Sequence, residues 1–109
     1  MNELETGCYA VIFTSLRAPG NDDEYARVSK QMDDLAATMP GYLGVETVRG
    51  ADGVGINVSY WATAEDVKHW KGIAEHDRAQ SRGREAYYEW YRVRVAKVER
   101  AYAFTKGEA

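Results

Sequence analysis

Four segments of the chain combine β-branched and aromatic residues with the two-residue hydrophobic period of β-strands. These predicted strands comprise residues 8–15, 42–49, 55–61 and 88–104. The first carries apolar side chains on both alternating faces, which is typical of a strand buried on two sides. Asp52 and Gly53 lie between the second and third segments and favour a tight turn. These two strands should therefore form a hairpin.

Two further segments place apolar residues at the spacing of amphipathic helices. The first follows the turn residues 19–23 and ends before Pro40, and its apolar stripe consists of Tyr25, Val28, Met32, Leu35 and Met39. Residues 63–66 resemble a capping box with Asp in place of Glu and should start the second helix. The apolar stripe of this second helix consists of Val67, Trp70, Ile73 and Ala74. Residues 77–86 predict only a short or irregular helix, because Gly83 interrupts a mostly polar segment.

The order strand, helix, strand, strand, helix, extra helix, strand is the split βαβ arrangement of ferredoxin-like α+β folds. It predicts one domain over residues 1–109, with a core of about 8–104 and a four-stranded antiparallel sheet covered by helices on one face. The strands carry apolar side chains on the other face as well, and a bare apolar sheet face is an association site. We therefore expect a homodimer joined through the sheet face opposite the helices.

Composition narrows the classes of function. Of the 109 residues, 45% are hydrophobic and 28% charged, as in a soluble globular domain. The formal net charge of −3 disfavours a general polyanion-binding surface. Cys8, the single cysteine, has no intramolecular disulfide partner and should be an inert hydrophobic residue. Residues 1–5 are acidic where a signal peptide is basic, and no apolar run reaches the ~20 residues of a membrane span. These features predict a cytoplasmic protein without a membrane partner.

Several segments with matching spacing resemble the antibiotic biosynthesis monooxygenase (ABM) family. They are Pro40–Gly44, Asn57–Trp61, Trp70 and Arg94–Arg100. The resemblance extends from Tyr9 to Phe104 and implies a ferredoxin-like fold and a homodimer in which two sheets face one another as a barrel. The family includes cofactor-free oxygenases of aromatic polyketide phenols, quinol-oxidising and haem-degrading members, and members that are not oxygenases.

The resemblance also implies site residues. In the phenol-oxidising members an Asn and a Trp four residues later line the pocket between sheet and helices, and Asn57 and Trp61 match that spacing. The aromatic hydroxyl expected six residues further on is replaced by Val67. In the haem-degrading members a histidine ligates iron ten residues after the helical Trp, and this position is Gln80 here. We therefore expect no haem, although His76 nearby keeps a haem-binding relative as an alternative. We also expect no flavin, because the chain has no phosphate-binding turn.

These residue types fit cofactor-free oxygen chemistry. Triplet dioxygen reacts slowly with closed-shell molecules, so the substrate itself must donate an electron, as a phenolate or hydroquinone anion does. Asn57, Ser59 and Trp61 share one strand face, so the amide and indole N–H groups are candidate donors to a substrate oxygen. His76 follows Ile73 by three residues and is the candidate general base. Ser59, Val67 and Trp70 are candidate substrate contacts, and the substrate should be a small aromatic molecule.

Other chemistries are disfavoured. The glycine-rich segment 50–55 lies between two strands, whereas a phosphate-binding loop needs a helix after it. Glu75, His76 and Asp77 lack a second histidine at metal-ligand spacing, so no metal is expected. RNA-recognition domains share this strand order, but the third strand lacks their basic, glycine and aromatic pattern. A non-catalytic homodimer that binds a small aromatic ligand in the same pocket remains an open alternative.

Overall fold

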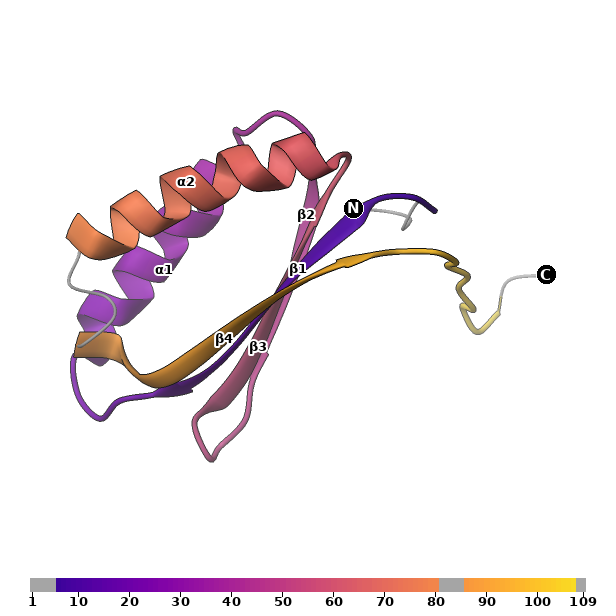
Figure 1. Cartoon of the computed structure of the whole chain (residues 1–109). Coiled ribbons are helices and arrows are strands. Elements are labelled where there is room, and N and C mark those ends of the chain that lie inside the picture. Colours follow the sequence, from indigo (N-terminus) through magenta and orange to yellow (C-terminus); the bar gives the residue numbers. More distant parts are fainter. Residues whose placement is uncertain (1–5, 81–85, 108–109) are drawn as a thin grey trace.

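The structure of the chain is a computed structural model, which describes residues 6–80 and 86–107, with only the helical backbone described over 76–80. The four strands and two main helices follow one another in the order that the sequence predicts (Figure 1). In chain order they are β1 (Tyr9–Arg17), α1 (Asp22–Ala36), β2 (Tyr42–Arg49), β3 (Val54–Trp61), α2 (Ala64–Gln80) and β4 (Tyr88–Lys97).

The four strands form one antiparallel sheet in the order β2-β3-β1-β4, with both helices on one face (Figure 1). The central strand β1 pairs with β3 on one side and with β4 on the other. The predicted ferredoxin-like α+β fold is therefore confirmed.

Local sequence signals account for the boundaries of these elements. Gly53 takes a positive φ of 88° in the turn between β2 and β3, a conformation that glycine adopts without steric penalty. The hydroxyl of Thr63 accepts a hydrogen bond from the Asp66 amide at 3.1 Å and donates to the Asp66 carboxylate at 2.8 Å. These two bonds cap the N-terminus of α2, at the place where the sequence predicts a capping box.

The helix-covered face of the sheet holds the larger core cluster. Trp61 of β3 is fully buried, and its ring stacks on Trp70 of α2 with centroids 5.6 Å apart. Ala36, Val67 and Ala74 complete the buried cluster, which thus joins the sheet to both helices. Burial of these apolar surfaces is the main stabilising contribution to the layer between sheet and helices.

The opposite face of the sheet carries a second apolar cluster. Its buried members are Cys8, Ala10 and Tyr60, and Ile12, Leu43, Val58 and Val98 pack against them. Val48 is 67% exposed and Ile56 42% exposed. Apolar side chains on both sheet faces are thus confirmed, whereas the homodimer inferred from them stays a prediction.

Two predicted boundaries differ from the structure. The last strand was expected to continue to Phe104 but ends at Lys97, which pairs with Tyr9, the first residue of β1. Beyond this point the strand has no continuous partner, although the Val98 amide still donates to the Cys8 carbonyl at 2.8 Å. The separate helix expected over 77–86 is also wrong in part, because α2 continues to Gln80; residues 81–85 lie outside the described part of the chain.

Candidate functional site

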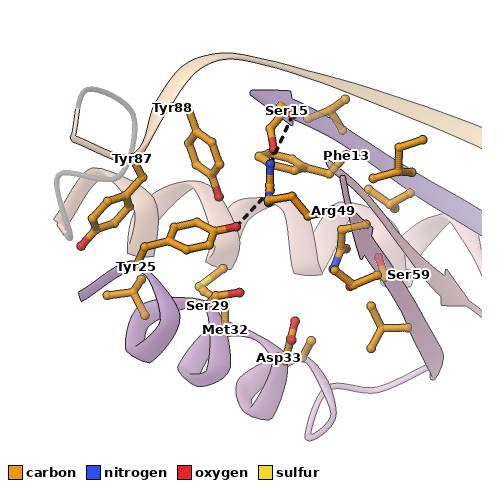
Figure 2. A pocket seen from close by; sticks show the side chains of 18 of the residues that line it. Phe13, Ser15, Tyr25, Ser29, Met32, Asp33, Arg49, Ser59, Tyr87 and Tyr88 are labelled. Carbon is orange, nitrogen blue, oxygen red and sulfur yellow. Dashed lines mark hydrogen bonds between the residues drawn. The ribbon is translucent and has the colours of Figure 1, made fainter. Parts of the chain in front are cut away.

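A pocket opens between α1 and the helix-covered face of the sheet (Figure 2). The space among its lining residues is about 1050 Å³ when the solvent at its open mouth is included. All four strands, both helices and the segment Tyr87–Tyr88 contribute to its lining. Side chains from widely separated parts of the sequence therefore meet in one cavity.

Asn57 and Ser59 line this pocket from β3. The Asn57 Nδ2 donates one hydrogen bond to Thr47 Oγ1 of β2 at 2.6 Å. This bond holds the amide in place, and within the described part of the chain its second N–H and its carbonyl oxygen have no partner. Both can therefore contact a ligand oxygen or hydroxyl.

Trp61 lies beneath the pocket wall and is not one of the lining residues. Its indole N–H donates to Ser59 Oγ at 2.9 Å, so this donor already has an acceptor inside the protein. The Ser59 oxygen accepts that bond, and its own hydroxyl proton stays available to the pocket. In this geometry Trp61 orients Ser59, and Ser59 is the group that can reach a ligand.

Of the other predicted site residues, Trp70 and Val67 line cavities, and His76 is not placed in one. Trp70 lines the main pocket and also a second hollow of about 610 Å³, between α2 and the strands β1 and β4. Val67 lines only the second hollow. His76 lies in α2, and its side chain is outside the described part of the structure. Its predicted role as a base is thus untested.

Arg49, which the sequence reasoning did not select, lies in the main pocket. The strand register explains the omission: the pairing of β2 with β3 shifts between Tyr42 and Gly44. If side chains alternated regularly from Tyr42, which faces the helices, Arg49 would lie on the opposite face of the sheet, here called the open face. The irregularity reverses the alternation, so Arg49 pairs with Gly55 on the helix-covered face.

Asp33 of α1 is the one carboxylate among the described pocket residues, and it remains accessible to solvent. Burial, followed by the neighbouring charge of Asp34, raises the pKa of Asp33 above its usual value. Burial and the charge of Asp33 likewise raise the pKa of Tyr42. A carboxylate with a raised pKa accepts a proton more readily than an ordinary one. In the sequence, Asp33 directly follows Met32 of the apolar helix stripe. This position was the signal that could have identified Asp33 as a pocket residue.

The described part of the chain contains no cluster of three or more metal-ligating side chains. Residues 50–53 form the turn between β2 and β3, and Val54 and Gly55 begin β3, so the glycine-rich segment is part of a hairpin, as the sequence predicts. In the same described part, no helix has the length and apolar character required to cross a membrane.

A four-stranded antiparallel sheet, helices on one face, and a pocket with a few polar groups between them define a small ferredoxin-like α+β domain. The chain belongs to the antibiotic biosynthesis monooxygenase family, whose model matches residues 8–82. It is 50% identical over 96 residues to the uncharacterized protein YqjZ of Bacillus subtilis, covering 88% of this chain and 83% of that protein.

More distant relatives have descriptive names or known structures. The chain is 29% identical over 94 residues to a jasmonate monooxygenase of Pyricularia oryzae, covering 83% of this chain but only 43% of that protein. The fold matches a mutant of SnoaB, a cofactor-independent oxygenase from Streptomyces nogalater, with a TM-score of 0.69, 11% identity, and 94% and 100% of the two chains covered. It also matches PA3566 from Pseudomonas aeruginosa, with a TM-score of 0.67, 17% identity, and 84% and 94% covered.

Proposed function

We propose that this protein is a cofactor-independent monooxygenase that oxidises a phenolic, quinol or polyketide-like aromatic substrate with dioxygen. The observation that carries the proposal is the pocket itself, in which the polar groups of Asn57 and Ser59 and the carboxylate of Asp33 lie among apolar and aromatic side chains. Membership of the family supports the same class of reaction. So do the names of the jasmonate monooxygenase and of SnoaB.

The reaction begins with removal of the phenolic proton. Asp33 is the first candidate for the base that accepts this proton, because it lines the pocket and its pKa is raised. His76, the base expected from the sequence, is the second candidate. In either case the proton moves from the phenol to the base, and the resulting phenolate is a far better electron donor than the neutral phenol.

The phenolate then transfers one electron to dioxygen, which gives a phenoxyl radical and superoxide. The two radicals combine by forming a carbon–oxygen bond at an unsubstituted ring carbon. Cleavage of the O–O bond, with loss of the ring hydrogen, leaves a quinone and releases the second oxygen atom as water. The substrate supplies all four electrons that reduce dioxygen: one oxygen atom becomes the new quinone carbonyl and the other becomes water, so no external reductant is required.

Asn57 and Ser59 are the groups that stabilise the anionic oxygen of the substrate. Hydrogen-bond donors already held in place stabilise developing charge without reorganisation. Thr47 holds the Asn57 amide, and Trp61 holds the Ser59 oxygen. Trp61 thus acts through Ser59, and Trp70 supplies an apolar wall.

The test is oxygen consumption by chelator-treated protein across a panel of hydroquinones and polyhydroxylated aromatics. With an active substrate, Asn57→Ala should lower turnover by ~10- to 1,000-fold, the range for losing one oriented donor. The variant that removes the true base, Asp33→Asn or His76→Gln, should shift the pH profile of turnover to alkaline values, and the other should leave it unchanged. Lys68→Gln, at an exposed site on α2, is the control.

Binding of aromatic ligands without oxygen consumption would support the alternative, a non-catalytic homodimeric binder. Full turnover in a folded Asn57→Ala variant would refute the assigned site. Haem binding on reconstitution, lost in His76→Ala, would instead support a haem-binding relative. The homodimer and the cytoplasmic location are part of the proposal and rest on the apolar sheet face and on the single cysteine.

A further inference from the structure

Arg49 is fitted closely into the pocket. Its guanidinium lies over Gly55 of β3, where an added Cβ would come within 2.5 Å of the Arg49 Cζ. The φ angle of Gly55 is not in the left-handed region, so its backbone does not require glycine. Gly55 instead leaves the space in which the guanidinium lies, between Ser15 of β1 and Tyr25 of α1 (Figure 2).

Every hydrogen bond that Arg49 makes in the described part of the chain has a neutral acceptor. Nη1 donates to the carbonyl oxygens of Gly53 and Ser15, the latter at 3.4 Å. Nη2 donates to Ser15 Oγ at 3.0 Å and to the Tyr25 hydroxyl oxygen at 3.1 Å. In contrast, Arg17 nearby has an ion pair with Asp22 at 2.8 Å.

The charge of Arg49 is therefore not neutralised by a carboxylate of the described chain. Asp33 lines the same pocket, but its pKa is raised by burial and by Asp34. A guanidinium in contact with Asp33 would lower that pKa instead. A half-buried cation without an opposite charge favours an anionic ligand beside it.

The Tyr25 hydroxyl next to Arg49 is a hydrogen-bond donor for an anion. The Tyr25 oxygen accepts from Arg49, so its own O–H group remains as a donor. A cation on the acceptor side of a hydroxyl strengthens the hydrogen bond that the hydroxyl donates. The ring of Tyr25 is held by the Arg17 guanidinium at 3.9 Å from its centroid, so this donor has a fixed position. Ser15 is fully buried, and its Oγ accepts from Arg49, so Ser15 positions the guanidinium and does not itself contact a ligand.

We propose that Arg49 and Tyr25 form a carboxylate-binding subsite in which Ser15 positions Arg49, and that the substrate is a hydroxyaryl carboxylic acid. The inference rests on the proposed function, because it places the phenolic oxygen at Asn57. Asn57 and Gly55 are two residues apart on β3, a separation of about 7 Å, which suits a carboxylate and a hydroxyl at opposite ends of an aromatic system. Phe13, with its ring stacked on Tyr91 at 5.1 Å, supplies an aromatic wall for that system.

The experiment is a binding titration in the absence of turnover, with 6-hydroxy-2-naphthoate and its methyl ester as matched fluorescent probes. At neutral pH the acid is ionised and the ester has no charge. The wild-type protein should bind the acid at least ~10-fold more tightly than the ester, as for one charge-assisted contact. Arg49→Gln should remove this preference, while Asn57→Ala should weaken both probes equally.

Tyr25→Phe keeps Arg49 and removes only the hydroxyl donor, whereas Ser15→Ala removes one acceptor that positions the guanidinium. Both variants therefore test the subsite if Arg49→Gln does not fold. Each should reduce the preference for the acid several-fold. Arg27→Gln removes the same charge from an exposed position on α1 and should leave the preference unchanged. Equal binding of acid and ester by the wild-type protein, or an undiminished preference in Ser15→Ala and Tyr25→Phe, would overturn the proposal. The assay measures binding and not oxygen consumption. It therefore tests the carboxylate subsite even if the protein is not an oxygenase.

Discussion

Replacement of Gly55 by alanine tests directly whether Arg49 is held where the structure places it. The new methyl group would lie 2.5 Å from Cζ and 2.8 Å from both Nη atoms, so the guanidinium must move. The strand backbone of Gly55 is open to alanine, because its φ is not positive. The perturbation is therefore confined to the contact between the two side chains.

The magnitude follows from the bonds that depend on this position. Arg49 makes four hydrogen bonds to neutral acceptors, and a bond with a charged partner contributes ~1.5–3 kcal/mol. Displacement that breaks about two of them removes roughly 3 kcal/mol or more. Alanine in place of glycine returns ~0.4–1 kcal/mol by restricting the unfolded chain. Gly55→Ala should therefore lower the free energy of unfolding by about 2 kcal/mol.

The assay is a double-mutant cycle measured by urea unfolding. In an Arg49→Ala background the space above Gly55 is empty, so Gly55→Ala should there be neutral or stabilising by ~0.4–1 kcal/mol. The change of sign between the two backgrounds is the expected result. An equal loss of stability in both backgrounds would show that Gly55 has a different role, and the packing argument for Arg49 would be wrong.

Two further predictions concern the open face of the sheet. Val58→Lys should dissociate a homodimer or unfold the chain, because it places an unpaired charge in the apolar cluster around Cys8, Ala10 and Tyr60. The control Gln31→Lys, at an exposed position, should do neither. A wild-type protein that sediments as a compact monomer at micromolar concentration would contradict the predicted homodimer. Burial and a 2.7 Å hydrogen bond to Glu46 raise the pKa of Tyr60 to about 12, above the value of about 10 in an unfolded chain. The protonated form is thus favoured on folding, and its contribution to stability should be complete below about pH 10 and be lost as the pH rises through about 12. Unfolding measured against pH should show this loss, Tyr60→Phe should reduce it, and an identical profile in the two proteins would rule out Tyr60 as its source.

Much of the fold was determined by local patterns in the sequence. The two-residue period located all four strands, the helical stripes located α1 and the start of α2, and the Thr63 hydroxyl caps the Asp66 amide as predicted. The Asp66 carboxylate instead accepts from the Thr63 hydroxyl. Asn57 and Ser59 share the strand face that lines the pocket, as the two-residue period predicts, while their roles in a site stay a prediction. These features depend on residues close together in the chain, and for that reason their signals can be read without a tertiary structure.

The tertiary structure decided the features that depend on pairing between distant segments. The irregularity in β2 turned Arg49 towards the helices, and β4 ended at Lys97, opposite Tyr9, the first residue of β1. In the folded chain the Trp61 N–H donates to Ser59, whereas the sequence spacing is equally compatible with donation to a ligand. Strand register and the partners of buried donors are set by contacts across the sheet, and one shifted residue reverses which side chains face the pocket. The sequence by itself therefore determined the framework and one polar wall of the site, while the charged end of the pocket arose only when the strands were paired.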